Sequence, residues 1–143
     1  KPFSVVLLDV IEKADSNVLL TFLQVLDDGR LTDSSGVTVS FANTIIIATS
    51  NVGTREIQLV AQRNGTFGEM EEAALSRVRE HFAPELLNRF SSIVVFNPLS
   101  REDVKKIALI TLSRVEKMAL EKNITVSFTE DLLDGLVDAG FNP

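Results

Sequence analysis

The stretch Ser4–Asp15, with the sequence SVVLLDVIEKAD, decides the fold of this chain. Residues 5–8 form an unbroken apolar run that ends in the carboxylate of Asp9. A short run of Val and Leu without polar alternation is typical of a strand that is buried on both faces. Such strands belong to parallel sheets that are covered by helices. The stretch therefore predicts an α/β fold, with Asp9 at the carboxyl end of a parallel strand.

This position makes Asp9 a candidate ligand-binding residue, because ligands of open α/β sheets bind outside the carboxyl ends of the strands. An unpaired carboxylate is costly to bury, and a bound cation is one solution. One interpretation is the Walker-B Asp, which holds Mg²⁺ against the phosphates in nucleotide-hydrolysing folds. The other is an Asp that caps the following helix. The local pattern leaves both interpretations open.

Composition excludes several classes of protein. The 143 residues are 45% apolar and 24% charged, which suits one globular domain, or one domain with a small appendage. A net charge of −6 argues against a nucleic-acid binder or an anionic-membrane binder. There is no Cys, and His81 is the only His, so no disulfide or multi-His metal cluster is expected. Without a signal peptide or an apolar run near ~20 residues, the expected location is the cytoplasm.

Two elements are expected between the first strand and the next buried one. A helix with one broad apolar face is predicted to begin at a cap among residues 15–17 and to end at Gly29. Residues 31–41 alternate between apolar and polar around Ser35 and Gly36, which predicts a β-hairpin.

The run TIIIATSN, residues 44–51, predicts a second buried strand that also ends in polar residues. Two such strands with a helix between them suggest one shared site at the edge of the sheet. Asn51 could orient a water or a phosphate there through its amide. The alternative is an ordinary turn or cap Asn.

The remaining residues predict further short elements. Phe67 is expected to be an exposed aromatic on a flexible loop. Arg89 ends a short helix, where a solvated or salt-bridged surface Arg is the ordinary interpretation. The expected elements are helices over 55–63, 69–82, 84–90, 101–121 and 130–140, a third buried strand over 92–96 and a short strand over 124–128.

The punctuated segment 97–100 predicts a domain boundary, which gives domains over 1–97 and 98–143. The chain starts without Met, shortly before a core strand, and stops in a turn-like sequence. We therefore expect it to be a piece of a longer protein.

Several segments together resemble one family, the Clp-type AAA+ unfoldases, at their second ATPase ring. They are SVVLLD-x-IEKA, FLQVLDDGRLTD, VSFANTIIIATSNVG, FAPELLNRF and VVFNPLS, and they follow the family's order and spacing over almost the whole chain. The resemblance implies a partial AAA+ nucleotide-binding subdomain over 1–97, which is a doubly wound parallel sheet lacking its N-terminal part. It also implies a small, mostly helical lid subdomain over 98–143, and a stretch that runs from Walker B to just before sensor 2.

The resemblance assigns roles to three residues. Asp9 matches the Walker-B Asp, which binds Mg²⁺ through water and so helps to hold ATP. Asn51 matches sensor 1, which orients the attacking water and reads the γ-phosphate. Arg89 matches the arginine finger, which reaches the nucleotide of the neighbouring subunit.

The same resemblance implies partners. The parent protein would be a homo-hexamer that threads substrate polypeptides through its pore, with no nucleic acid or membrane partner. Relatives that feed a Clp peptidase carry a docking tripeptide in the interval that here contains Gly65–Gly68. The sequence Thr-Phe-Gly departs from that tripeptide, so a Clp peptidase is only a secondary candidate partner.

Several departures from the family limit this assignment. Val10 stands where the family has the Glu that activates water, and Val has no acceptor for a proton. Glu12 belongs to another position of the motif and is not expected to replace that Glu. Asp15 stands where the family has His. The sequence also contains no phosphate loop, pore loop or sensor-2 motif.

These features predict part of an ATP-driven unfoldase, with two alternatives. The first alternative is a module that holds ATP but is hydrolysis-deficient, and the second is an interaction fragment without activity. The 143 residues alone are expected to be inactive.

Overall fold

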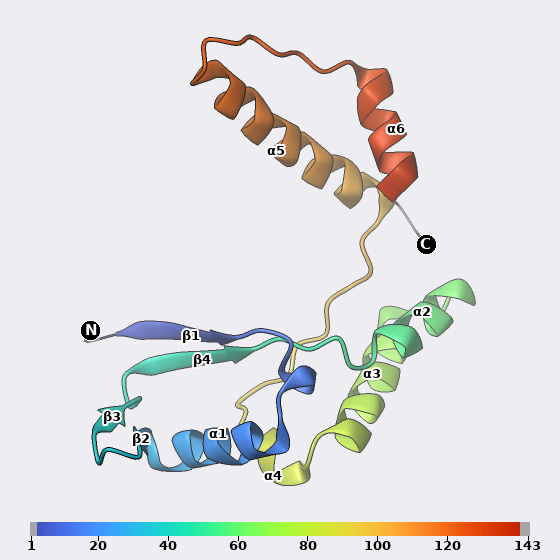
Figure 1. The fold of residues 1–143 in the computed structure, drawn as a ribbon. Helices are drawn as coiled ribbons and strands as arrows, with labels where there is room; N and C mark the ends of the chain where they lie inside the picture. Colours follow the sequence, from blue (N-terminus) through green and yellow to red (C-terminus); the bar gives the residue numbers. More distant parts are fainter. Residues whose placement is uncertain (1–2, 141–143) are drawn as a thin grey trace. The chain divides into compact units, whose positions relative to one another are not determined.

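The computed structural model describes residues 3–140 and divides into two compact units, Lys1–Phe96 and Asn97–Pro143, whose outermost residues lie outside the described range (Figure 1). The first unit contains two small sheets and most of the helices. Its elements are β1 (Ser4–Leu8), η1 (Ile11–Lys13), α1 (Ser16–Asp28), β2 (Arg30–Thr32), β3 (Thr38–Ser40), β4 (Thr44–Ala48), α2 (Thr54–Gln62), α3 (Phe67–His81) and α4 (Pro84–Leu87). The second unit contains α5 (Arg101–Leu120) and α6 (Glu130–Gly140).

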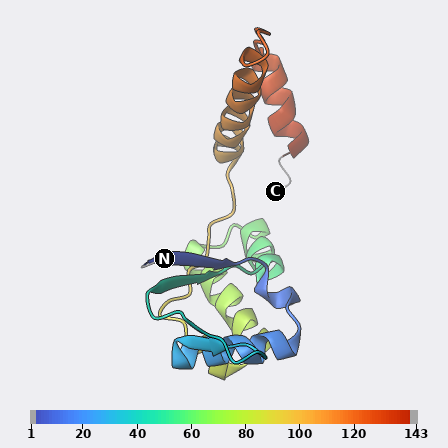
Figure 2. The same cartoon turned by 60° about the vertical axis from the view of Figure 1, so that its left-hand side comes forward.

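The central sheet of the first unit is parallel, as the sequence predicts. β1 pairs with β4 in a register that sets Ser4 opposite Thr44 and Leu8 opposite Ala48. α1 and the antiparallel hairpin of β2 and β3 connect the two strands. In both cartoon views α1 runs along one face of this sheet (Figures 1 and 2). The α/β fold class is therefore confirmed.

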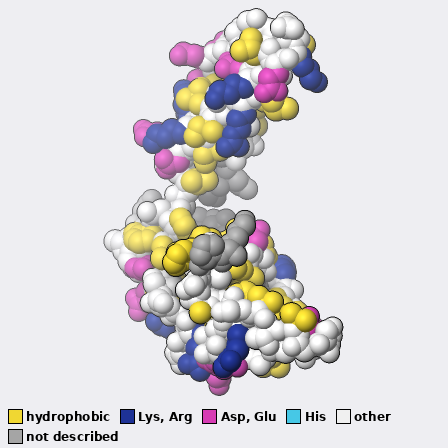
Figure 3. Space-filling view, turned by 90° about the vertical axis from the view of Figure 1, so that its left-hand side faces the viewer, with side chains coloured by type: hydrophobic (Ala, Val, Ile, Leu, Met, Phe, Trp, Pro, Cys, Tyr) yellow, Lys and Arg dark blue, Asp and Glu magenta, His cyan; other side chains and the backbone are white. Residues whose placement is uncertain are grey.

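The expectation that these strands are buried on both faces is wrong. Every second side chain is exposed, with Val5 at 62%, Leu7 at 60% and Ile45 at 65%. An apolar run indicates that both faces of a strand can be buried. Each face is buried only when a layer of helices covers it. Among residues 3–140 only one face is covered, and hydrophobic side chains accordingly appear on the surface (Figure 3).

The hydrophobic core of the first unit lies on the covered face. Ile11, Phe82 and Leu86 are its most buried members. Through their contacts, residues near the end of β1, helix α1 and the turn between α3 and α4 pack against one another. The side chains that complete this core are Leu8, Leu19, Phe22, Leu23, Leu26, Ala48, Val52, Val78, Leu87 and Phe90.

Two expected strands do not form. Residues 92–96 and 124–128 have no regular structure, and the side chains of Val94 and Phe96 are 70% and 83% exposed. A strand needs the backbone of a neighbour to satisfy its N–H and C=O groups. No strand within the described range pairs with either segment, so their apolar composition is not sufficient.

The helix signals near α1 are confirmed. Asp15 accepts a hydrogen bond from the backbone N–H of Asn17 at 2.8 Å, and Gly29 ends the helix with φ 62°. A carboxylate at the N-cap satisfies a backbone donor that has no partner within the helix.

The expected flexible loop around Phe67 is wrong. α3 begins at Phe67, two residues earlier than expected, because Thr66 and Glu69 form a capping box. The Gly65 N–H also donates to the Val60 carbonyl at 2.9 Å. The connection between α2 and α3 is therefore tight, and residues 67 and 68 already belong to α3.

The second unit is a pair of helices. Ser100 and Asp103 form the capping box of α5, and the buried side chains are Leu133 and Val137 of α6. Two ion pairs join the helices, Arg101 with Asp138 at 2.5 Å and Lys105 with Asp134 at 2.8 Å. Within the described residues, no helix has the length and apolar character needed to cross a membrane.

Gly53, which follows the polar end of β4, is required by two local constraints. Its φ is +92°, and a Cβ there would lie 2.9 Å from the Cα of Ala74 in α3.

We predict that Gly53→Ala lowers the free energy of unfolding by about 1–3 kcal/mol, measured by urea denaturation. Gly135→Ala is the matched control, since open space surrounds Gly135 within α6. It should raise stability by about 0.5–1 kcal/mol, and equal effects of the two changes would contradict the account.

Candidate functional site

The ends of β1 and β4 bring Asp9 next to Thr49. The parallel register continues past the strands, since the Thr49 N–H donates to the Leu8 carbonyl at 2.9 Å. The Thr49 hydroxyl donates to Oδ1 of Asp9 at 2.5 Å. Asp9 is exposed, and Asp15 rather than Asp9 caps α1, so the helix-cap interpretation of Asp9 is wrong.

Val10 has an unusual backbone conformation at this site. Its φ and ψ are 58° and 54°, in the left-handed region that β-branched residues rarely adopt. Its N–H donates to Thr49 Oγ1 at 3.0 Å, and the Ile11 N–H donates to the Thr49 carbonyl at 2.9 Å. The Thr49 hydroxyl thus links the Asp9 carboxylate to the backbone of residue 10. The Val10 side chain adds no polar atom.

The structure brings Glu12 to Asn51, which the sequence did not indicate. Glu12 Oε1 accepts hydrogen bonds from the backbone N–H of Asn51 at 3.1 Å and from its side-chain Nδ2 at 3.2 Å. The two residues are 39 positions apart, so no local pattern reports their contact. The only sequence feature that could have indicated this contact is that Glu12 and Asn51 each follow a predicted strand by a few residues.

The Glu12 carboxyl is ionised more readily than an ordinary one. Partial burial raises its pKa, but the hydrogen bonds from backbone N–H groups and from the Asn51 side chain outweigh burial, so the pKa lies below its usual value. Its second oxygen, Oε2, is buried and has no hydrogen-bond partner within residues 3–140.

Arg89 is not brought to the Asp9 and Asn51 groups by any contact in the described part of the chain. It follows α4, and its guanidinium forms an ion pair with Asp27 near the end of α1. This agrees with the ordinary interpretation of a salt-bridged Arg.

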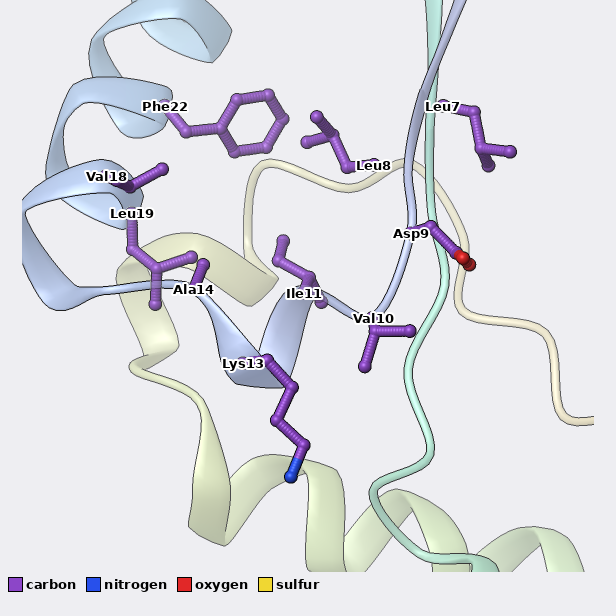
Figure 4. Close-up of a pocket in the computed structure, with 10 residues that line it drawn as sticks. All are labelled: Leu7, Leu8, Asp9, Val10, Ile11, Lys13, Ala14, Val18, Leu19 and Phe22. Atoms are coloured by element: carbon purple, nitrogen blue, oxygen red, sulfur yellow. The ribbon is translucent and has the colours of Figure 1, made fainter.

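A cavity of about 440 Å³ adjoins the site between β1, η1 and α1. In the close-up, Leu8 and Phe22 lie on its apolar side, and the Asp9 carboxylate points away from them (Figure 4). This follows from the alternation of side chains along a strand. Apolar side chains therefore dominate the lining of the cavity, while Asp9 and Lys13 add charged groups to it.

The donor set fits one particular kind of metal site. No cluster of three or more His, Cys, Asp or Glu residues that could hold a metal occurs within residues 3–140. Asp9 instead offers one exposed carboxylate that is oriented by Thr49. Mg²⁺ is commonly held by one or two carboxylates together with waters and substrate phosphates. The arrangement fits Mg²⁺ that arrives with a phosphate ligand.

Comparison with family models matches both units. Residues 1–93 match the model described as AAA domain (Cdc48 subfamily). Residues 99–143 match the C-terminal, D2-small domain of ClpB protein.

Curated proteins and solved structures give similar matches. The chain is 43% identical to chaperone protein ClpB 1 of Synechocystis and 46% identical to ClpB of Pseudomonas putida, covering all of this chain in each case. It spans only 16% of the length of these relatives. Among solved structures, Saccharomyces cerevisiae Hsp104 bound to casein in an extended conformation has a TM-score of 0.80 at 39% identity. A closed state of Hsp104 with ATPγS and casein has a TM-score of 0.81, and each match covers 99% of this chain and 24% of the other.

The left-handed backbone of Val10 leads to a stability prediction. We expect Val10→Asn to raise the free energy of unfolding by about 1 kcal/mol, because Asn tolerates this conformation and Val does not. Val5→Asn is the control, since Val5 is exposed but lies in an extended strand, where Asn is unfavourable. Urea unfolding of both variants checks this expectation. A lower stability for Val10→Asn would show that the backbone is not strained there.

The lowered pKa of Glu12 predicts a pH effect. The folded-state pKa lies below the unfolded value of about 4.3, so the carboxylate stabilises the fold above that pH. This contribution is lost as the pH falls through the folded pKa. Glu12→Gln should therefore reduce stability at pH 7 more than at pH 3, as measured by urea titrations at both values. If the loss of stability caused by Glu12→Gln is the same at both pH values, this prediction is wrong.

Proposed function

Because the chain belongs to the Clp-type AAA+ proteins, we propose that it is part of an ATP-driven unfoldase that threads polypeptides through a hexameric ring. The names of the relatives support a chaperone role, since the matched curated proteins are ClpB chaperones. The solved Hsp104 complexes hold casein, and one also holds ATPγS. Polypeptide substrates and ATP are therefore the proposed ligands, and the cytoplasm is the proposed location.

In this proposal, the Asp9 carboxylate holds Mg²⁺ through water. The single observation that supports it most is the hydrogen bond from Thr49, which engages Oδ1 and leaves Oδ2 available. When bound, Mg²⁺ would neutralise charge on the β- and γ-phosphates of ATP. Asn51, at the same edge, would act as sensor 1 on the attacking water and the γ-phosphate.

Arg89 would act in trans as the arginine finger. Such an Arg stabilises the charge that develops during phosphoryl transfer in the neighbouring subunit. In the isolated chain Arg89 pairs with Asp27, and both side chains are about half exposed. Exposed ion pairs contribute little free energy, so this contact would be easily exchanged for a phosphate. The unit Lys1–Phe96 would be part of the large AAA+ subdomain, and Asn97–Pro143 part of the helical lid.

A specific observation supports a second candidate, a module that holds nucleotide without hydrolysing it. Val10 occupies the position of the water-activating Glu and offers no acceptor. A positioned general base typically contributes about 10²–10⁴ in rate. A Clp peptidase is the less favoured partner, because residues 67 and 68 belong to the first turn of α3 and not to a free loop.

The two candidates are separated by a chimera that carries this chain in place of the matching segment of ClpB from Meiothermus ruber, which is 45% identical to it. We expect the 143 residues alone to hydrolyse no ATP. We expect the chimera to hydrolyse ATP about 10²-fold more slowly than the same chimera with Val10→Glu. Steady-state ATPase assays measure both rates.

This experiment has one control variant and one outcome that would contradict the interpretation. Asp9→Ala in the Val10→Glu chimera should abolish turnover, because the Mg²⁺ carboxylate is then missing. Equal rates with Val10 and with Glu at position 10 would refute the hydrolysis-deficient interpretation.

A further inference from the structure

We infer that Glu12 is a positioning residue for Asn51, and that its carboxylate turns the Asn51 amide so that Oδ1 is presented to the ligand side as an acceptor. The contact itself is a feature of the structure. That the presented atom faces an attacking water rests on the proposed function.

The chemistry of the two groups fixes the orientation of the amide. Glu12 Oε1 lies 3.1 Å from the backbone nitrogen of Asn51 and 3.2 Å from its Nδ2. An ionised carboxylate only accepts hydrogen bonds, so the NH₂ group of Asn51 must face Glu12. The opposite amide orientation would set two acceptors against each other. Oδ1 therefore points away from Glu12.

The rest of Asn51 is held in place independently. Its carbonyl accepts hydrogen bonds from the Thr54 hydroxyl at 2.8 Å and from the Thr54 N–H at 3.2 Å. These bonds fix the backbone of Asn51 where α2 begins. The side-chain torsions are the remaining freedom, and Glu12 is the residue that restricts them.

Glu12 is suited to holding the amide and poorly suited to taking a proton. The hydrogen bonds that lower its pKa stabilise the charged form. They make Glu12 a weaker base than an ordinary Glu, so it does not substitute for the acceptor that is missing at Val10. Its role is to constrain Asn51.

This orientation of the amide limits the groups that Asn51 Oδ1 can bind to hydrogen-bond donors. Oδ1 is an acceptor, and phosphate oxygens are acceptors too, so direct contact between them is unfavourable. A water molecule donates to Oδ1 readily. Asn51 would thus orient the attacking water through Oδ1, and only the second Nδ2–H, which Glu12 does not use, would donate to a phosphate oxygen.

The first test follows the Asn51 side-chain NH₂ by NMR in the 143-residue chain, with its exchange with water as the readout. We expect Glu12→Ala to speed this exchange about tenfold, because the amide loses an acceptor that carries charge. Glu12→Gln should restore slow exchange, since the Gln carbonyl oxygen still accepts. Glu72→Ala, on the exposed face of α3, is the matched control and should change nothing. Unchanged exchange in Glu12→Ala would overturn the inference.

The second test uses the chimera described above with Val10→Glu. We expect Glu12→Ala to lower kcat about tenfold and to leave KM for ATP unchanged, because the Oδ1 atom that Glu12 orients acts on water. A rise in KM without loss of kcat would overturn the water-orienting role. If the chimera neither binds nor hydrolyses ATP, the proposed function fails, and the NMR measurement still decides whether Glu12 positions Asn51.

Discussion

The parallel pairing of β1 with β4 is the constraint on which the rest of the site depends. Its register places Leu8 opposite Ala48, so the next residues, Asp9 and Thr49, leave the sheet side by side. The hydroxyl of Thr49 then donates to Asp9 and accepts from the N–H of Val10. A shift of one residue would turn Asp9 toward the apolar core. Backbone pairing, more than any side chain, therefore determines which acid is exposed at the edge.

Two hydrogen-bonded groups form at this edge. One joins Asp9, Thr49 and the backbone of residue 10, and the other joins Glu12 to Asn51. Glu12 lies within the short η1 helix, which follows Asp9 and Val10. Its core residue, Ile11, is buried against Phe82 and Leu86, so the apolar core anchors the turn that carries both groups. Apolar packing on the covered face of the sheet thus holds the polar groups at its edge in position.

Much of this arrangement could be predicted from the sequence, and the rest could not for identifiable reasons. Asp9 and Asn51 were identifiable because both follow apolar runs that form parallel strands. The contact of Glu12 with Asn51 was not, since it depends on tertiary approach across 39 residues. Residues 92–96 show the opposite error. Their composition suits a strand, but composition cannot supply the neighbouring backbone that a strand requires.

Under the proposed function, the backbone at residue 10 also separates the Mg²⁺ site proposed at Asp9 from the hydrolytic role proposed for position 10. The conformation of Val10 is held by two bonds of its own main chain: its N–H donates to the Thr49 hydroxyl, and its carbonyl accepts from the Lys13 N–H at 3.0 Å. None of these bonds involves the side chain of residue 10. A residue without an acceptor can therefore occupy the position while Asp9 stays oriented by Thr49. The cost is backbone strain of about 1–3 kcal/mol, which neighbouring contacts must offset. Under the proposed function, a side chain at position 10 that cannot accept a proton need not weaken the carboxylate site beside it, because the two depend on different atoms.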